Sequence, residues 1–299
     1  MSRFWRIPAA LIALLILPAG SPAVLAEEIG SKYDADLQKV VEIRRKIGDI
    51  HPFLDRLFPI AVVENDSFLI FDLDSSKEKY IFVRKAPTPL PVPVGIRAAF
   101  PLECYGNQAA CVVSGEVFES LEGYVTIFHE FMHCHQWATC EQKLKEKLTV
   151  AQKALSRQDY SWEINYPFPY THRRFTRTYS RFLKALAEKD SQAIAKSRRR
   201  LQRILPQPDF EYLVWQEWKE GFARFIENRI RRRLDLPENH YGQEPPFHRI
   251  SFYEGGARYI EYLTGQQPEL MTDPEALFYK LFSPTSENPV SGDSASHVR

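Results

Sequence analysis

The chain has 299 residues, of which 44% are hydrophobic, and its formal net charge at pH 7 is +1. This is ample apolar material for a large core, and neither an internal repeat nor a long low-complexity linker divides it, so one large domain or two are expected. The near balance of 39 basic and 38 acidic residues gives no reason to expect a nucleic-acid or membrane-surface partner.

Residues 1–26 have the pattern of a secretory signal peptide. Arg3 and Arg6 precede an apolar run of about 11 residues, and Val24-Leu25-Ala26 suits signal peptidase. The run is shorter than the ~20 residues that cross a bilayer, although an uncleaved amino-terminal anchor is the alternative. No later segment is apolar enough to span, so we expect a mature protein without a membrane span, in the periplasm or outside the cell.

One helix and a small antiparallel sheet are expected at the start of the mature chain. Ser31 can cap a helix over 33–47, in which the apolar residues form one stripe. Three short apolar runs, separated by polar turns, predict antiparallel strands: 60–63, 68–72 and 80–83. The proline-rich segment 87–93 must be extended, since proline denies a ladder its donors, and it serves as a spacer or a sheet edge.

The segment that follows contains the motif H-E-x-x-H. His129 and His133 are four residues apart, so on a helix they lie on one face and can offer two imidazole nitrogens to one zinc ion. Glu130 then sits beside the metal, where a carboxylate can accept a proton from an activated water and pass it to a leaving amine. The surrounding residues are apolar and predict a buried helix, in which an unpaired polar trio would be costly. A chance match of three positions is the alternative.

A third ligand is expected farther along the chain, because a tetrahedral catalytic zinc takes three protein ligands and leaves the fourth position to water. Glu220 lies in a second amphipathic helix, directly before the small residues Gly221 and Ala223. Small residues let two helices approach closely. We therefore expect Glu220, rather than Glu217 or Glu227, to lie within about 5 Å of both imidazoles.

The gluzincin metallopeptidases contain a helix of the form N-E-G-F-A-x-Y-V-E, which residues 220–227, with the sequence EGFARFIE, resemble. The resemblance implies that His129, His133 and Glu220 are the zinc ligands and that Glu130 is the general base. It also implies an α+β, zincin-like fold with a small N-terminal antiparallel sheet and a mostly helical C-terminal half.

Three features depart from that family. The two motifs are 87 residues apart, from His133 to Glu220, which is far more than is usual there. Lys219 replaces the Asn before the third ligand. The chain has no G-x-M-E-N segment of the kind that grips a free amino terminus, so the resemblance does not imply aminopeptidase specificity.

The resemblance also implies two further parts of the site. Gluzincins supply a Tyr or His from beyond the third ligand to stabilise the oxyanion, for which Tyr253 is the first candidate and His248 the second. Aromatic packing of a helix that begins near Ser251 is the alternative for each. In zincins, a strand at the edge of the cleft also pairs with the extended substrate. The resemblance implies that residues 94–117 contain this strand here.

An even number of cysteines in an exported protein predicts two disulfides, among Cys104, Cys111, Cys134 and Cys140. If the metal helix continues through Cys140, then Cys134 and Cys140 are about 9 Å apart, beyond the ~7 Å that a bridge allows. Either the helix ends near Trp137 or the two pair with Cys104 and Cys111, which we favour. A metal cluster of Cys134, His135 and Cys140 is the alternative.

The segment 141–205, between the two ligand motifs, repeats apolar residues at helical spacing and predicts a helical insertion that caps or walls the cleft. Within it, the run Arg198-Arg199-Arg200 fans out around a helix, which indicates a solvated face rather than a nucleic-acid patch. Residues 283–299 have the composition of a disordered tail, so the metallopeptidase domain is expected over 27–282.

The predicted function is zinc-dependent hydrolysis of peptide bonds in a peptide or protein substrate, in an exported compartment. Zinc held by His129, His133 and Glu220 would activate water, and Glu130 would move its proton. Two alternatives stay open: a secreted zinc-binding protein that keeps the scaffold without turnover, and a hydrolase of amides in cell-wall peptide. The presence of Glu130 weighs against the first, because a structural metal site needs no base.

Overall fold

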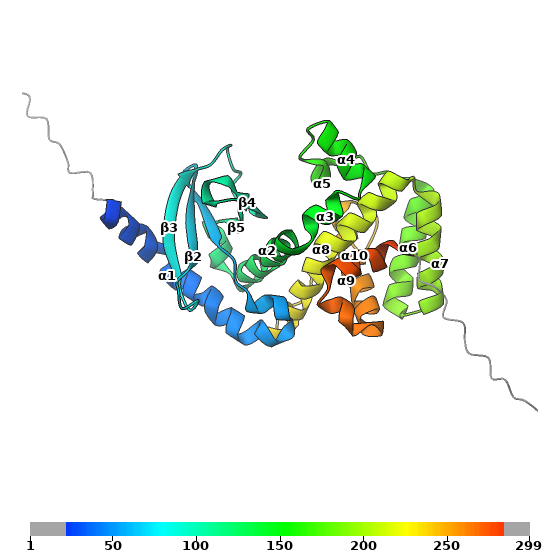
Figure 1. Cartoon of the computed structure of the whole chain (residues 1–299). Coiled ribbons are helices and arrows are strands. Elements are labelled where there is room, and N and C mark those ends of the chain that lie inside the picture. Colours follow the sequence, from blue (N-terminus) through cyan, green and yellow to red (C-terminus); the bar gives the residue numbers. More distant parts are fainter. Residues whose placement is uncertain (1–21, 284–299) are drawn as a thin grey trace, which may run out of the picture.

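The computed structural model describes residues 22–283, with side chains from residue 31 onward. Most of the predicted signal peptide, residues 1–21, and the predicted tail beyond residue 283 lie outside the described residues. Figure 1 shows a sheet and the long helix α1 at one end of the molecule and a helical part at the other. The predicted α+β class is therefore confirmed.

A mixed sheet of five strands forms the N-terminal half. Its strands are β1 (Ile60–Glu64), β2 (Ser67–Leu73), β3 (Tyr80–Pro87), β4 (Arg97–Leu102) and β5 (Gln108–Ser114), in the order β3-β2-β1-β5-β4. The three strands expected near the start pair antiparallel, but β1 and β5 pair in parallel. The sheet is thus not wholly antiparallel, because the chain passes through three more strands before it returns beside β1.

The described residues also form ten α-helices, besides short 3-10 turns: α1 (Pro22–Ile47), α2 (Leu121–Thr139), α3 (Glu141–Lys145), α4 (Thr149–Ser156), α5 (Trp162–Asn165), α6 (Arg173–Glu188), α7 (Ser191–Ile204), α8 (Gln207–Arg233), α9 (Arg249–Gln266) and α10 (Pro274–Phe282). Because α1 already begins at Pro22, Ser31 lies inside it and is not its cap. Among the described residues, no helix has the length and apolar character needed to cross a membrane.

The H-E-x-x-H helix is at the centre of the molecule. Ser120 begins α2 by accepting a hydrogen bond from the Gly123 amide, 3.1 Å away. Its apolar residues, such as Val125, Phe128 and Phe131, are buried in the main core, and α2 packs against β4, β5 and α8. The expected buried helix is confirmed, and it joins the sheet to the helical half.

Helices α8 and α9 contact each other backbone to backbone. A Cβ atom on Gly221 would lie 2.6 Å from the Gly256 Cα, and one on Gly256 would lie 2.4 Å from the Glu217 carbonyl oxygen. Gly221 therefore serves the approach of α9, not the approach of α2 that we expected. The consequence for the site is that α9 brings Tyr253 close to the Glu220 turn of α8.

A buried ion pair fixes α7 against α8. Arg198 is only 1% exposed, its Nη1 lies 2.6 Å from Glu217 Oε2, and its Nη2 donates to the Leu281 carbonyl. The prediction of a solvated face is thus wrong for Arg198, since Glu217 supplies the partner that burial of a guanidinium requires.

The cysteines form no disulfide. Cys104, Cys111, Cys134 and Cys140 are all free, so the predicted pairings are wrong. Helix α2 runs through Thr139 with Cys140 as its cap residue, which keeps Cys134 and Cys140 apart. The alternative metal cluster is not formed either: among the described residues, only His129, His133 and Glu220 group as metal ligands would, and the His135 ring instead stacks on Phe53 with centroids 3.5 Å apart.

Acid is expected to weaken the fold through His51. Its Nδ1 accepts from the Phe53 amide and its Nε2–H donates to the Met271 carbonyl, and burial lowers its pKa to about 4. The unfolded pKa is near 6.5, so the unfolded state binds more protons between these values. The contribution of His51 to the free energy of unfolding is therefore complete above pH 6.5 and is lost as the pH falls toward 4.

Urea unfolding of the wild type and of His51→Gln at pH 7.5 and pH 4.5 measures this effect. When the pH is lowered from 7.5 to 4.5, the free energy of unfolding should fall by about 2 to 3 kcal/mol more in the wild type than in the variant. Equal losses would show that protonation of His51 does not oppose folding.

Candidate metal centre

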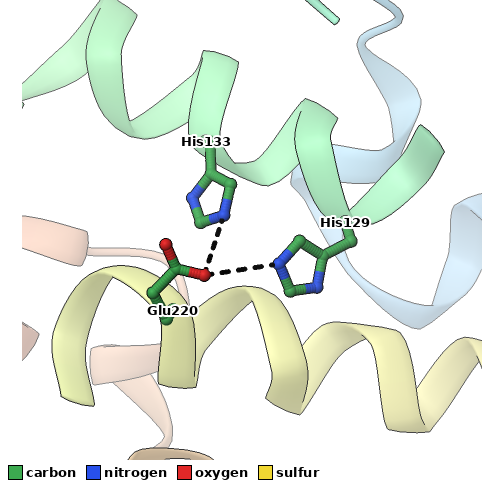
Figure 2. A group of neighbouring side chains, drawn as sticks. All are labelled: His129, His133 and Glu220. Carbon is green, nitrogen blue, oxygen red and sulfur yellow. Dashed lines mark ion pairs between the residues drawn. The ribbon is translucent and has the colours of Figure 1, made fainter. Parts of the chain in front are cut away.

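Three side chains from two helices point toward one another (Figure 2). Helix α2 supplies His129 and His133, and α8 supplies Glu220. Glu220 Oε2 lies 3.7 Å from His129 Nε2 and 3.5 Å from His133 Nε2, and the three ligand atoms lie within 4.8 Å of one another. The expectation that Glu220 approaches both imidazoles is confirmed.

The spacing of these atoms suits a metal ion. In a tetrahedral zinc site with bonds near 2.1 Å, neighbouring ligand atoms are roughly 3.4 Å apart. The separations of Glu220 from the two histidines need only small side-chain adjustment to reach this value. Two imidazole nitrogens and a carboxylate are also the ligand set of a catalytic zinc with one position left open.

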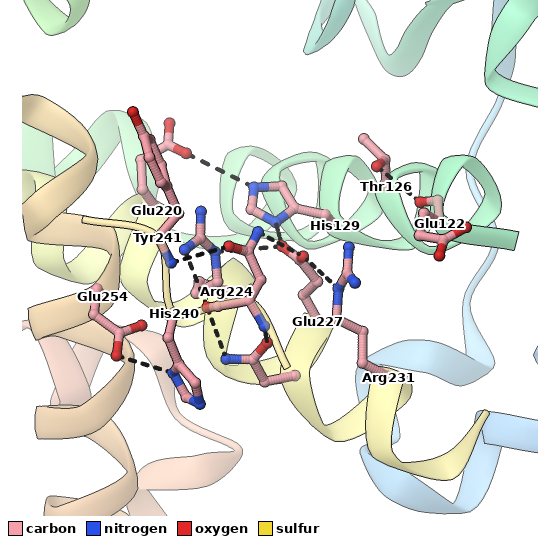
Figure 3. A network of polar contacts seen from close by, with 12 residues as sticks. Glu122, Thr126, His129, Glu220, Arg224, Glu227, Arg231, His240, Tyr241 and Glu254 are labelled. Atoms are coloured by element: carbon pink, nitrogen blue, oxygen red, sulfur yellow. Dashed lines mark hydrogen bonds and ion pairs between the residues drawn. The ribbon is translucent and has the colours of Figure 1, made fainter. Parts of the chain in front are cut away.

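Outer hydrogen bonds aim both imidazoles at the centre (Figure 3 shows the first of them). His129 Nδ1 lies 2.9 Å from Glu227 Oε2, and His133 Nδ1 lies 3.0 Å from Gln136 Oε1. With Nδ1 bonded outward, Nε2 is the nitrogen of each ring that faces Glu220 and is left for a metal ion. Partners of this kind fix the tautomer and orientation of metal-binding histidines.

These two outer partners were not predicted, although the spacing carries a signal for each. Glu227 follows Glu220 by seven residues, which is two helical turns on the same face of α8. Gln136 follows His133 by three residues on α2. Its amide also donates to the carbonyl oxygens of Trp218 and Lys219, so it ties α2 to α8 just before the Glu220 turn.

Negative charge surrounds His129. Burial disfavours its protonated form, but the Glu220 carboxylate, 3.7 Å from Nε2, and the hydrogen bond with Glu227 outweigh burial and raise the pKa of His129 to about 10. The same imidazoles hold the pKa of Glu220 well below its usual value despite burial. A proton or a metal ion can offset this negative potential, and a metal ion would use both Nε2 atoms and Glu220 at once.

Glu227 is itself held as an anion. Although burial opposes ionisation, the His129 hydrogen bond and the nearby cations lower the pKa of Glu227 to about 2. Arg231 Nε and Asn239 Nδ2 donate to Glu227 Oε1 over 2.9 and 3.2 Å. These bonds orient the carboxylate that orients His129.

Glu130 lies on the same turn as the ligands and is left without a hydrogen bond. It is buried, it lines the cavity that His129 and His133 also line, and none of the described residues donates a hydrogen bond to its carboxylate. Burial raises its pKa, against the influence of the two histidines. A carboxylate with raised pKa and free oxygens is suited to proton transfer.

Tyr253 reaches the centre, and His248 does not. Tyr253 lines the cavity, and Arg249 donates a hydrogen bond to its hydroxyl. Burial, with Glu220 nearby, raises the pKa of Tyr253, so the phenol stays neutral and keeps its proton to donate. His248 instead is the residue that precedes α9, where its backbone N–H donates to the Ser251 hydroxyl, and it is not among the residues that line the cavity. Of the two oxyanion candidates, only Tyr253 is in position.

The centre lies in a cavity of about 670 Å³. One wall is β4, the edge strand of the sheet, through residues 97–101, and α2 forms the floor with its histidines. The opposite side includes Tyr160, Glu163 and Ile164 around α5, together with parts of α8 and α9. The start of the helical insertion therefore walls this cleft, whereas α6 and α7 do not line it.

Two lysines neutralise two glutamates on the α5 side. Lys145 Nζ lies 2.7 Å from both Glu141 Oε1 and Glu163 Oε1, and Lys219 Nζ lies 3.1 Å from Glu141 and 2.9 Å from Glu163. Lys219, at the position where the gluzincin helix that residues 220–227 resemble has Asn, thus links α8 to the segment 141–205 through Glu141 and Glu163. Both carboxylates are occupied and unavailable to a cationic ligand.

Comparison with known protein families, with curated proteins and with solved structures finds no match to this chain. The candidate site rests on its own geometry.

Glu227→Gln is expected to lower zinc affinity by about 10- to 100-fold, the usual effect of losing an outer-shell partner. The amide still accepts from His129 Nδ1 but no longer supplies the charge that makes the imidazole a strong ligand. Competition with a zinc-selective fluorescent chelator measures the affinity, and Glu261→Gln, at an exposed position on α9, is the control. Equal affinities for Glu227→Gln and this control would contradict the role given to Glu227.

Proposed function

We propose that this protein is an exported zinc peptidase of the gluzincin type. One observation carries the proposal. A Glu220 oxygen lies near both histidine Nε2 atoms, and the carboxylate of Glu130, which has no hydrogen bond from the described residues, lines the same cleft. A binding protein has no use for that carboxylate, whereas hydrolysis requires a base at this place.

His129, His133 and Glu220 would hold the zinc ion. When bound, zinc polarises a carbonyl group and lowers the pKa of water toward about 7. Glu130 takes the proton of the attacking water on its free carboxylate and gives it to the departing amine nitrogen. The neutral Tyr253 hydroxyl donates to the oxygen on which negative charge develops. Glu227 and Gln136 keep the imidazoles in the required orientation throughout.

Strand β4 offers unpaired backbone groups to an extended peptide. The Ser114 amide donates to the Ile96 carbonyl, so by alternation Ala98 and Phe100 also bond to β5, while Arg97, Ala99 and Pro101 face the open edge. Pro101 has no N–H to leave unpaired, which suits an outward position. A substrate backbone would pair with the N–H and C=O of Ala99.

The charges in the cleft argue against recognition of a free amino terminus. Glu141 and Glu163 are neutralised by lysines, and Glu227 by His129 and Arg231. The cleft instead presents apolar side chains to a substrate: on the wall opposite β4, Tyr160 is 80% exposed and Ile164 is 63% exposed. We therefore propose cleavage of bonds flanked by apolar residues, without need of a free terminus.

A peptide library with free and acetylated amino termini, incubated with the zinc-loaded protein and read by mass spectrometry, tests this proposal. We expect cleavage next to apolar residues, with rates on acetylated and free peptides agreeing within about twofold. Zinc bound at one equivalent without cleavage of any peptide would favour the secreted binding protein. Cleavage confined to added cell-wall peptides would favour the amide hydrolase.

Tyr253→Phe is expected to lower kcat by about 10²- to 10³-fold with little change in KM, as for the loss of one oxyanion donor. The ring and its packing are kept, and only the hydroxyl is removed. Steady-state kinetics on the best library peptide measures the effect, with Tyr241→Phe at an exposed position as the control. An unchanged kcat would show that the Tyr253 hydroxyl does not stabilise the oxyanion and that Tyr253 serves only in the packing of α9.

A further inference from the structure

A second and larger hollow of about 1000 Å³ lies between α6 and α7, and it is strongly basic. Of its thirteen lining residues, eight are Arg or Lys and only Glu188 is acidic. We call this hollow the basic groove. Figure 1 shows the α6–α7 hairpin at the opposite end of the molecule from the sheet, so the groove is separate from the metal centre.

The basic groove is built by helical spacing. On α6, the residues Arg174, Arg177, Arg181 and Lys184 recur at intervals of three and four and so share one face. On α7, Lys196, Arg200 and Arg203 do the same. Small residues form the rest of its lining: Thr178, Ala185, Ala193 and Ser197. Two rows of cations therefore stand on either side of a shallow floor.

Among residues 31–283, acids compensate little of the charge in the groove. All eight basic residues are exposed. Among the described residues, Lys184 is the only one of the eight that forms an ion pair, and its Nζ lies 3.7 Å from Glu188. The other arginine run of the chain contrasts with it, because Arg231, Arg232 and Arg233 each have an acidic partner. In a protein of net charge +1, such a local excess creates a positive field that attracts anions.

We propose that the basic groove binds a linear polyanion that carries phosphate groups. Six of the eight cations are arginines, whose planar guanidinium matches phosphate oxygens in pairs. The lining has no aromatic residue on which a base could stack and no apolar pocket for a side chain. The ligand is therefore recognised through its charged backbone alone.

The shape of the groove favours a chain over a flat surface. From Arg173 to Lys184 the α6 row extends over roughly 16 Å, given 1.5 Å per residue. A polymer can lie between the two rows and contact both at once, whereas a planar bilayer would meet the rims only. Bound in this way, the protein would be held on a phosphate-rich polymer while the zinc cleft at α2 stays free.

Fluorescence anisotropy with a labelled inorganic polyphosphate chain of defined length tests the proposal. The variant Arg177→Gln/Arg181→Gln/Arg200→Gln should bind at least 10-fold more weakly than wild type. The matched control Lys85→Gln/Lys153→Gln/Arg157→Gln removes three exposed cations outside the groove and should bind within about twofold of wild type. When the logarithm of the binding constant is plotted against the logarithm of the salt concentration, the slope for the groove variant should be shallower than that for wild type by about 2 to 3, since three phosphate contacts are lost.

Several results would overturn the proposal. Equal affinities for the groove variant and the matched control would show that the site lies elsewhere. Tight binding of poly(glutamate) with the same number of charges would remove the preference for phosphate. Groove-dependent binding to anionic lipid vesicles, but not to polyphosphate, would assign the groove to a membrane surface. A wild-type affinity for polyphosphate that is independent of salt would exclude phosphate contacts without reference to any variant.

Discussion

Replacing Glu130 by Gln is expected to reduce peptide hydrolysis by at least 10²- to 10⁴-fold while zinc stays bound at one equivalent. General acid–base catalysis contributes about this factor, which corresponds to roughly 3 to 5 kcal/mol of the barrier. Gln has nearly the same size as Glu, and the three ligand residues are untouched. An amide cannot accept a proton from water at neutral pH, so only the proton transfer fails.

The measurement combines zinc content with kcat/KM on the best library peptide. Glu122→Gln, at an exposed position in the first turn of the same helix, is the matched control and should keep wild-type activity. If Glu130→Gln hydrolyses peptide as fast as wild type with zinc bound, then Glu130 is not the base and the proposed mechanism is wrong.

Replacing Glu220 by Gln is expected to act on metal affinity instead. The variant loses the anionic ligand while both imidazoles and their outer partners remain, so zinc should bind more weakly than in Glu227→Gln. Removing a direct ligand should therefore cost more than the 10- to 100-fold that an outer partner costs. Because Glu130 is intact, added zinc should restore part of the lost activity.

A zinc titration of activity separates the two variants. Glu220→Gln should respond to added zinc, Glu130→Gln should not respond, and Glu261→Gln should behave as wild type. Wild-type zinc affinity in Glu220→Gln would show that Glu220 is not a ligand and would leave the two histidines to a different partner.

The local parts of the site follow from the sequence. The four-residue spacing of His129 and His133 determines that they share a face of any helix, and apolar neighbours determine that this helix is buried. Three strands and most helices are also readable from their periodicity. Glu220 was reached through its resemblance to a known helix and through the small residues beside it, and the structure places it against both imidazoles.

Long-range partners were decided only by tertiary structure. Arg198 has the same local pattern as a solvated arginine, and only the packing of α7 on α8 shows that it is buried against Glu217. Likewise, the even number of cysteines predicted disulfides, yet all four cysteines are free in the folded chain. The parallel pairing of β1 with β5, and with it the exposure of β4 to the cleft, has no signature in either strand alone.

The physical reason is the range of the interactions. Helical and strand periodicity depends on neighbours within a few residues, which the sequence states directly. The pairing of Glu227 with His129 joins residues 98 positions apart, and it depends on how α8 lies across α2. That arrangement results from the summed packing of many apolar side chains, together with the backbone contact between Gly221 and Gly256. The sequence by itself therefore indicated the three side chains of the candidate centre, and the tertiary structure decided which residues orient them.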